Sequence, residues 1–509
     1  MRIKYLDVLK AFAIIAVVLY HAGYMTYGYL GVDLFLVISG YLTTKGLYSK
    51  VLAKRGSSYV GFEISRIIRL LPPLLVAGLF CMLLGYFVML PDDYENLSES
   101  VIAANGFANN ILAAITTKNY WDVTNEFKPL MHTWYVGVVM QFYLVYPILF
   151  ILAKLDKKNS KSTLLTMIAI LAVVSLLVYF GTEDAAKRFY YLPSRFFEFA
   201  IGGIVALTYN PKENKPFGSV FVYVCYALLL ALMATNAELI PSNIRLVSVV
   251  ALSAVLLCSR DVLENKISGN TILAMVGAAS YSIFIWHQII LAFCRYVITN
   301  KITVPVFILV LLATASLSWL SYQLIEQATV KALKTRHGKI VLYSSTIALF
   351  FALNAFAAYI YLNAGVVRDI PELYVSMKNK HRGMHAEYVD RANQYNKPFS
   401  TDKQHWYVIG NSFGRDFVNV ILESPVADSV EVSYSTNLAF QNEKDRFRDA
   451  DIVFISTLGL TEEFVTEVEI HCLANGLQPN RLIIVGEKNF GVSNGQVYAK
   501  RGDADYFNQ

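Results

Sequence analysis

Long apolar blocks alternate with short charged loops over roughly the first 360 residues of the chain. Each block approaches the roughly 20 residues that an α-helix needs to cross the hydrocarbon core of a bilayer. The pattern therefore predicts eleven spanning helices. They are expected at residues 8–24, 31–47, 70–90, 134–153, 163–180, 195–209, 217–234, 244–258, 272–297, 304–324 and 339–362.

One further apolar segment, 101–117, is interrupted by Asn105, Asn109 and Asn110. Side-chain amides are costly in hydrocarbon, so we interpret this segment as an interfacial or re-entrant piece and not as a span. Counting it as a span would invert the orientation of every helix that follows it.

Lys and Arg residues gather in alternate loops, which by the positive-inside rule face the cytoplasm. With eleven spans all these clusters lie on one side, so the N-terminus is predicted inside and the tail outside. The first block follows Arg2 and Lys4 without a small-residue cleavage site, and it is interpreted as a retained helix. The clusters are Lys45, Lys50, Lys54, Arg55, Arg66 and Arg69; Lys154, Lys157, Lys158 and Lys161; Lys212 and Lys215; Arg260 and Lys266; and Lys331, Lys334, Arg336 and Lys339.

After about residue 363 the chain becomes polar, with short β-type runs at 405–410, 451–456 and 481–486. Helical patterns separate these runs, which is the alternation expected of a parallel α/β sheet. The chain is thus predicted to be an α-helical polytopic membrane protein, with ten core transmembrane helices plus an eleventh, followed by a small extracytoplasmic α/β domain.

Composition narrows the class of protein further. Of the 509 residues, 55% are hydrophobic and 16% are charged, and the mean hydropathy is +0.44, whereas soluble domains carry about a quarter charged residues. This excludes a soluble single-core protein. The net charge of +6 reflects the cytoplasmic loops, so no nucleic-acid partner is expected. The five cysteines have no CxxC spacing, so they indicate neither a metal site nor a disulfide framework.

Ionisable side chains in spanning helices usually face a cavity or a partner, which makes each of them a functional candidate. With the topology above, several of them lie near the outer ends of different spans. They are His21, Asp33, His132, Arg195, Glu198 and His287.

His21 is the strongest candidate for acid–base chemistry, because a histidine accepts a proton near neutral pH and can deprotonate an acceptor hydroxyl. Asp33 is a candidate to orient it. In the alternative interpretation His21 only hydrogen-bonds a neighbouring carbonyl. Arg195 and Glu198, three residues apart on one helix face, have the alternative of a structural ion pair.

Arg66 and Arg69 share one helix face on the predicted cytoplasmic side. Guanidinium groups fit phosphate oxygens, including those of a CoA donor. The alternative is an ordinary positive-inside anchor.

Ordered motifs along some three hundred residues resemble the acyltransferase-3 family of integral membrane acyltransferases. The motifs are KYLDVLKAFAIIAVVLYHAG at 4–23, GYLGVDLFLVISGYLTTK at 28–45, SRIIRLLPP at 65–73, PLMHTWYVGVVMQFYLVYP at 129–147, YYLPSRFFEFAIGG at 190–203 and ASYSIFIWHQ at 279–288. The resemblance implies a membrane domain at 1–330, with an additional helix at 331–365.

The resemblance also implies a bundle that takes an acyl group, commonly acetyl from acetyl-CoA or another acyl-CoA, and transfers it to an envelope glycan. His21 is similar to the family's essential first-helix histidine, and Arg66 and Arg69 to its Arg-x-x-Arg pair. No metal is expected, and the expected location is the bacterial inner membrane. Besides His21, Asp33 is assigned a catalytic role. The residues assigned to substrate binding are His132, Trp134, Arg195, Glu198 and His287.

Val139 departs from the family pattern. Many relatives carry a glutamate at this place in the motif that begins at His132, whereas this chain has an apolar residue. If that glutamate has a catalytic or orienting role, Asp33 or Glu198 is expected to replace it, or the activity is weakened or altered in substrate.

The tail carries VIGNSFGRD at 408–416, a strand, turn and helix that place Ser412 at a helix N-terminus, where backbone amides stabilise an oxyanion. This segment resembles the first block of SGNH hydrolases, which often follow the extra helix in acyltransferase-3 proteins. The expected tail is a linker at 366–400 and an SGNH-like domain at 401–509, with Ser412 as a further catalytic candidate.

The SGNH pattern is incomplete in this chain. The usual Gly-Asp-Ser reads Gly-Asn-Ser at 410–412, and no terminal Asp-x-x-His follows. His471 and Asp503 stand in no recognisable motif, and Asn489 is a candidate remnant oxyanion donor or a turn residue. A serine without a base is a poor nucleophile, so a truncated or binding role is the alternative.

Two other classes of protein remain beside the acyltransferase. A transporter or flippase of a lipid-linked sugar would use the same polar groups to line a pathway, although no inverted repeat is visible. A catalytically inactive relative would account for Val139 and the incomplete tail. Incorporation of an acyl group into glycan separates both from the enzyme.

Overall fold

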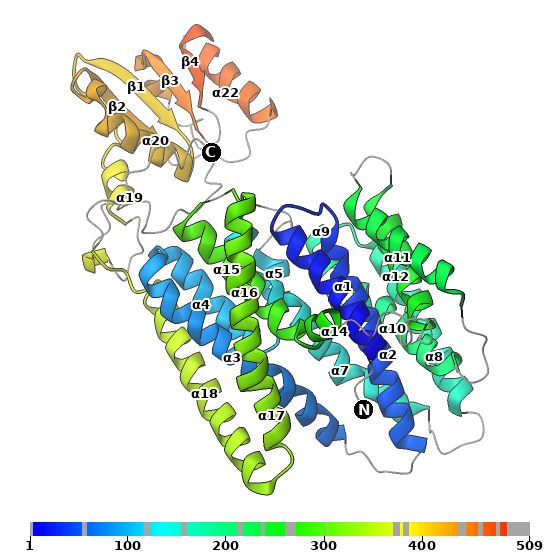
Figure 1. Ribbon diagram of the computed structural model, residues 1–509. Coiled ribbons are helices and arrows are strands. Elements are labelled where there is room, and N and C mark those ends of the chain that lie inside the picture. Colours follow the sequence, from blue (N-terminus) through cyan, green and yellow to red (C-terminus); the bar gives the residue numbers. More distant parts are fainter. Residues whose placement is uncertain are drawn as a thin grey trace. The chain divides into compact units, whose positions relative to one another are not determined.

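The computed structural model falls into two compact units, a membrane unit that ends at Gly365 and a tail unit that begins at Val366 (Figure 1). The structure describes residues 4–52, 59–116, 123–153, 160–210, 217–235, 240–259, 271–299, 301–369, 377–379, 386–435, 444–456, 462–474 and 479–485.

Helices coincide with all eleven predicted apolar blocks of the membrane unit. Pro193 and Pro305 stand in the first turns of α10 and α16, where the missing N–H has no helical partner to lose. The helices are α1 (Lys4–His21), α2 (Gly31–Leu52), α3 (Tyr59–Val88), α7 (Trp134–Leu152), α8 (Ser160–Gly181), α10 (Leu192–Thr208), α11 (Ser219–Ala234), α12 (Ser242–Leu257), the pair α14 (Thr271–Ala278) and α15 (Ser280–Val297), α16 (Val304–Ser321) and α18 (Arg336–Leu362). Between them lie α4 (Pro91–Asn105), α5 (Asn109–Thr116), α6 (Val123–Glu126), the 3₁₀ turns η1 (Gly28–Leu30) and η2 (Met131–Thr133), α9 (Ala185–Tyr190), the π-helical turn η5 (Tyr322–Glu326) and α17 (Gln327–Ala332).

Six helical runs among the described residues are long and apolar enough to cross a membrane, and a bent pair makes a seventh. The chain therefore fits a multi-pass membrane protein. Helices α11 and α12 are apolar but have only 16 residues each. The count of eleven crossings stays a prediction. The six runs are Gly28–Ser49, Tyr59–Val88, Met131–Leu152, Ser160–Gly181, Val304–Ala332 and Arg336–Leu362.

The ninth predicted span, 272–297, is broken in the structure. Helices α14 and α15 meet at Ala279 with a bend of 76°. Close packing holds α14 against α1, because a Cβ atom at Gly277 would lie 1.8 Å from the carbonyl oxygen of Asp7. The bend separates His287 on α15 from the first part of the block, which packs on α1.

The segment 101–117 is not one helix. Helix α4 ends at Asn105 and α5 begins at Asn109, and between them Phe107 has a φ of 55°, a conformation that helices exclude. With 15 and 8 residues, neither helix reaches the length of a crossing.

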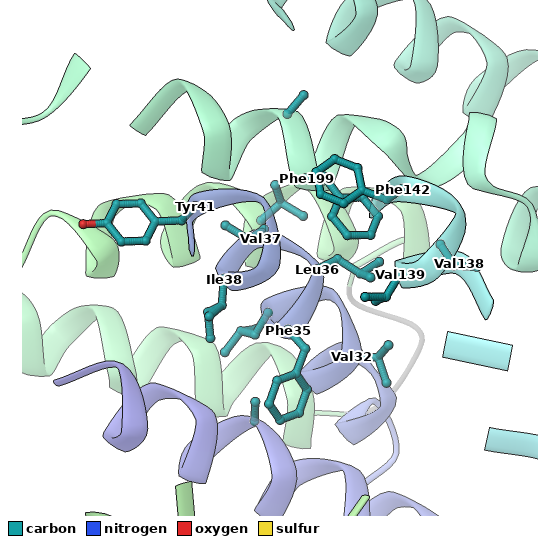
Figure 2. Packing of buried hydrophobic residues seen from close by; sticks show 14 of the residues in the cluster. Val32, Phe35, Leu36, Val37, Ile38, Tyr41, Val138, Val139, Phe142 and Phe199 are labelled. Carbon is teal, nitrogen blue, oxygen red and sulfur yellow. The ribbon is translucent and has the colours of Figure 1, made fainter. Parts of the chain in front are cut away.

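Helix α2 forms the centre of the membrane unit and packs against α1, α7, α10 and α12. Figure 2 shows its apolar side chains beside those of α7 and α10, where Phe142 and Phe199 stack with ring centroids 4.0 Å apart. Small residues let α2 and α10 approach closely, since a Cβ at Gly40 would lie 2.0 Å from the Phe199 carbonyl oxygen. Helix α18, the predicted additional helix, lies beside α3, α4 and α17 (Figure 1).

The tail unit contains a four-stranded parallel sheet in the order β2-β1-β3-β4. The strands are β1 (Gln404–Ile409), β2 (Val430–Ser435), β3 (Ile452–Ile455) and β4 (Leu482–Ile484), and the helices are α19 (Ala386–Asn393), α20 (Ser412–Glu423), α21 (Lys444–Asp449) and α22 (Glu462–Ala474). The predicted parallel sheet is confirmed, and the sequence interpretation missed β2.

Apolar residues cover both faces of the central strands, as parallel sheets require. Tyr407 and Ile409 of β1 belong to one buried cluster, and Val408 belongs to a second cluster with Phe454. Part of the predicted linker joins this domain, because α19 packs on α20 and the Tyr434 N–H donates to the Tyr395 carbonyl oxygen at 2.9 Å.

A carboxylate fixes the start of the tail sheet. Glu431 on β2 accepts hydrogen bonds from the backbone N–H and hydroxyl groups of both Ser400 and Thr401, at 2.7–3.1 Å. Partial burial opposes ionisation, but these bonds outweigh it and lower the pKa of Glu431 from its ordinary value of 4.5 to about 2. The ionised group therefore stabilises the fold above pH 4.5, and this contribution is lost as the pH falls toward 2.

Glu431→Gln is expected to destabilise the start of the sheet at pH 7 by on the order of 2 kcal/mol, because charged acceptors form the stronger bonds. Hydrogen exchange of the peptide containing Ser400 and Thr401 measures this loss. The difference from wild type should shrink at pH 3. Glu423→Gln, which breaks only the exposed pair with Arg391, is the matched control. A difference that stays constant between pH 7 and pH 3 would contradict the assignment.

Candidate active site

Helix α1 joins two cavities of the membrane unit. Lys10 lines one cavity and His21, the last residue of α1, lines the other. Eleven residues of helix separate them by about 16 Å along the axis. We call them the arginine cavity and the His21 cavity.

The arginine cavity contains both arginines of the predicted pair, and its volume is about 130 Å³. Arg66 lies over the rings of Phe62 and Tyr143, each 4.9 Å from its guanidinium carbon, while Arg69 is exposed. Lys10 is a third cation in the lining. The apolar lining residues are Phe35, Ile38, Leu42, Val136, Val139 and Phe284. The cavity can hold a ligand with an anionic end and an apolar end.

Val139, the residue that departs from the family pattern, is one of these apolar lining residues. Figure 2 shows it on α7, beside Leu36 of α2. A carboxylate here would face the same cavity as Arg66 and Arg69. The substitution therefore removes a negative charge from the arginine cavity and not from the surroundings of His21.

Three histidines from three segments far apart in the sequence come together between the cavities. The ring centroid of His287 is 5.2 Å from that of His21 and 5.3 Å from that of His132. His287 and His132 are buried. The Nδ1 atom of His287 lies 3.0 Å from the Ile283 carbonyl oxygen, which can only accept, so Nδ1 carries the proton and Nε2 is the basic nitrogen. Within the described residues, no three His, Cys, Asp or Glu side chains form a metal-binding arrangement.

Phe284 separates this histidine cluster from the arginine cavity. Its ring centroid lies 5.0 Å from that of His132 and 5.8 Å from that of His287. Phe284 also lines the arginine cavity, together with Tyr135, whose ring is 5.1 Å away. A group that contacts Phe284 in that cavity is therefore one aromatic layer from the histidines.

Asparagines of the broken segment 101–117 hold the turn that carries His132. Asn109 Nδ2 donates to the Leu130 carbonyl oxygen at 2.9 Å and to Thr133 Oγ1 at 2.7 Å. Asn110 donates to the Tyr190 carbonyl oxygen at 3.1 Å. Asn109 thus holds the backbone around η2 and the position of His132, while Asn110 ties α5 to the end of α9.

The His21 cavity has a volume of about 310 Å³. Arg295, buried on α15, donates to the His21 carbonyl oxygen at 2.8 Å and pairs with Glu126 Oε2 at 3.2 Å. The C-terminal end of α1 is therefore anchored to α15. The cavity is lined by Tyr20, His21, Gly23, Met25, Thr26, Asn125, Glu126 and Met131.

Asp33 belongs to an ion network. Arg195 Nη1 donates to Asp33 Oδ1 at 2.9 Å and to Glu198 Oε1 at 2.8 Å, and all three side chains are at most 3% exposed. The geometry contains the ion pair of Arg195 with Glu198, and Asp33 shares the same guanidinium group. The catalytic role of Asp33 and the substrate-binding roles of Arg195 and Glu198 stay predictions.

Trp134 also lies in this network and is 1% exposed, with its ring centroid 4.8 Å from that of Phe189. Phe189 in turn lies under the Arg195 guanidinium at 4.8 Å. The structure thus places Trp134, Arg195 and Glu198 in close packing, while His132 and His287 approach His21.

Ser412 opens α20 directly after β1 and is exposed. Asn411 caps this helix by accepting from the Phe413 N–H at 3.1 Å. Because β1 lies between β2 and β3, its carboxyl end is the switch point at which such sheets bind ligands. The side chain of His471, and Asn489 and Asp503, lie outside the described residues.

The sequence interpretation missed four ionisable residues, of which Lys10 and Glu126 line the cavities and Arg295 and Glu326 contact residues around them. Lys10 and Arg295 stand within predicted spans, so the rule that selected His21 and His287 would have found them. Glu126 precedes a span. Glu326, on the π-helical turn η5, accepts from the Ser282 hydroxyl and lies within electrostatic range of Arg69 and Lys10. No hydropathy pattern marks a π-turn, although such turns are frequent at functional sites.

Comparisons with known proteins agree with the motifs. The family model of the acyltransferase domain Acyl_transf_3 matches residues 3–323. The O-acetyltransferase OatA of Staphylococcus aureus strain NCTC 8325 / PS 47 is 28% identical over 342 residues, which is 63% of this chain and 56% of OatA. A protein of strain COL, provisionally named an O-acetyltransferase, is 26% identical over 356 residues, 65% of this chain and 58% of its own length.

This chain thus spans little more than half the length of the curated relatives that it matches. No solved structure matches it significantly. The matched region contains both cavities, the three clustered histidines and the arginine pair. Since the family model covers more than half of the chain, this protein belongs to the acyltransferase-3 family.

Proposed function

We propose that this protein is a membrane O-acyltransferase that moves an acyl group, with acetyl as the first candidate, from cytoplasmic acyl-CoA to a hydroxyl of an envelope glycan. Lipopolysaccharide O-antigen, exopolysaccharide and peptidoglycan are the candidate acceptors. One observation carries the proposal: α1 links a cavity with three cations to a cluster of three histidines. The similarity to O-acetyltransferases supports it.

The arginine cavity is the proposed donor site. Guanidinium groups bind phosphate oxygens in paired hydrogen bonds, so Arg66 and Arg69 would hold the phosphates of acyl-CoA. The apolar lining residues Val139 and Phe284 would contact the acyl end of the donor. This arrangement directs the thioester toward the histidine cluster.

His21 is the proposed general base. The sugar hydroxyl gives its proton to the imidazole as its oxygen attacks the thioester carbonyl carbon, the carbon–sulfur bond breaks, and the departing thiolate of CoA takes up the proton. His287 lies against His21, and His132 lies against His287, so both rings form part of the surroundings of the proposed base. Asp33 remains in the ion network.

The proposed orientation follows the predicted topology. The N-terminus lies in the cytoplasm of a bacterial cell, the bundle lies in the inner membrane, and the tail lies in the periplasm or outside the cell. The arginine cavity then faces the CoA pool, and the His21 cavity faces the side where glycans are exported.

An SGNH-like tail is part of the proposal. Support comes from the parallel order β2-β1-β3-β4 and from Ser412 at the carboxyl end of β1. If Ser412 carries an acyl intermediate, the bundle passes the group to the tail. Otherwise the bundle acylates the glycan directly and the tail binds the product or acceptor.

The function is tested by following labelled acetyl from acetyl-CoA into envelope glycans of cells that express the chain. Label that depends on the protein supports the acyltransferase. No label with any of several acyl donors would overturn the proposal in favour of a transporter or an inactive relative.

Arg66→Ala and Arg69→Ala are each expected to raise the KM for acetyl-CoA about tenfold or more, since a charged hydrogen bond contributes roughly 1.5–3 kcal/mol. Arg66→Lys should not restore binding, because lysine lacks the planar fork that stacks between Phe62 and Tyr143. The control is Arg336→Ala, an exposed position at the start of α18. An unchanged KM in both alanine variants would remove the donor site from this cavity.

A further inference from the structure

The polar wall of the His21 cavity has no role in the mechanism above. It is polar and mixed in chemistry, with the hydroxyls of Tyr20 and Thr26, the amide of Asn125 and the carboxylate of Glu126. The volume of about 310 Å³ lies at the lower end of the range of small-molecule sites, about 300–1,000 Å³. A space of this size suits one sugar unit and not a folded polymer.

Arg295 fixes this wall relative to His21. Its guanidinium donates to the His21 carbonyl oxygen at 2.8 Å and to the Glu126 carbonyl oxygen at 3.2 Å, and it pairs with Glu126 Oε2 at 3.2 Å. Gln288 adds a bond to the Glu126 carbonyl oxygen at 3.2 Å. Two buried residues of α15 therefore hold the four-residue helix α6 and the end of α1 in fixed positions relative to each other.

The Glu126 side chain remains half exposed, at 51%, although it is paired. Its Oε2 atom pairs with Arg295 at 3.2 Å. A carboxylate held by one oxygen presents its other oxygen as an acceptor in a fixed direction. Neighbouring hydroxyls of a sugar ring are donors at suitable spacing, and an amide such as Asn125 both donates and accepts.

We propose that Tyr20, Thr26, Asn125 and Glu126 form the acceptor subsite of this protein and bind one pyranose unit of the glycan. Glu126 accepts from ring hydroxyls, Tyr20 packs its ring against the apolar face of the sugar, and His21 faces the hydroxyl that is acylated. Arg295 is a positioning residue, which sets the distance between Glu126 and His21. This assignment rests on the proposed function and extends it to the acceptor side.

The test uses the purified full chain in lipid nanodiscs with labelled acetyl-CoA. The varied substrate is envelope polysaccharide isolated from the bacterium that naturally contains the protein. Glu126→Gln and Asn125→Ala are each expected to raise the polysaccharide concentration at half-maximal rate about tenfold, the effect of losing a strong hydrogen bond. The maximal rate and the KM for acetyl-CoA should change less than about twofold. Glu126→Asp should recover part of the affinity.

Glu183→Gln, an exposed acid in the loop before α9, is the matched control and should behave as wild type. If wild type transfers acetyl, and both subsite variants reach half-maximal rate at the same polysaccharide concentration as wild type, the subsite is disproved and the proposed function stands. If the variants lose maximal rate and donor affinity together, Glu126 has a structural role and the subsite is equally disproved. If wild type transfers no acetyl to polysaccharide, the proposed function itself fails.

Discussion

Replacing His21 with alanine is expected to reduce acyl transfer to glycan by roughly 100- to 10,000-fold, the usual contribution of a general base. His21 is the member of the histidine cluster that lines the His21 cavity, so its loss removes proton acceptance where the hydroxyl binds. Donor binding should persist, because Lys10, which lines the arginine cavity, lies about 16 Å from His21 along α1. The measurement is labelled acetyl in glycan, with the protein level matched to wild type.

Two further variants make this result specific. His337→Ala changes an exposed histidine of α18 and should leave transfer unchanged. Ser412→Ala separates the routes: label that survives this change identifies the bundle as self-sufficient, and label that requires both residues favours a relay through the tail. Transfer by the His21 variant within about tenfold of wild type would be incompatible with a base at this position.

Arg195→Ala is expected to cost about 3–5 kcal/mol of folding free energy, as breaking a buried ion pair does. The change leaves Asp33 and Glu198 facing each other without a cation, and both are at most 1% exposed. Like charges in a buried site repel strongly, so the packing of α2 against α10 should loosen. Thermal unfolding of the purified protein in detergent measures the loss.

The comparison with a surface pair tests whether burial causes the effect. Lys187→Ala removes an exposed pair with Asp184, whose side chains are 57% and 47% exposed, and should cost less than about 1 kcal/mol. Replacing all three network residues with Met, Asn and Gln at 195, 33 and 198 should restore much of the stability, because no buried charge remains. Equal unfolding temperatures for Arg195→Ala and wild type would refute the network's structural role.

The positions of the helices could be predicted because the bilayer imposes one requirement on every span, a long apolar run. Runs of apolar residues also located β1, β3 and β4 of the tail, which are short and continuously apolar. The hydropathy pattern missed β2. In VEVSYS, residues 430–435, polar residues alternate with apolar ones, and Ser433 is nonetheless fully buried with its hydroxyl on the Lys397 carbonyl oxygen. A strand whose polar groups are satisfied by tertiary contacts leaves only a weak hydropathy signal.

The candidate site was predictable as a set of residues and not as an arrangement. His21, His132 and His287 were each visible as ionisable groups in apolar surroundings, and the structure brings their rings together. The partner of Asp33 was not predictable, since Arg195 is 162 residues away and hydropathy contains no information on which charges meet. Nor was the bend between α14 and α15 predictable, where Gly277 packs against α1.

Asp33 and Arg195 are in contact but 162 residues apart in the sequence, which has a consequence for biosynthesis. At about 5–20 residues per second, roughly 10–30 s pass between the synthesis of these two residues. During that interval α2 carries a carboxylate that the lipid cannot solvate. We expect its first turn to stay at the water interface, or with an insertase, until α10 enters the membrane. The contact between Asp33 and Arg195 is thus a late step of membrane insertion. The final position of α2 depends on the entry of α10.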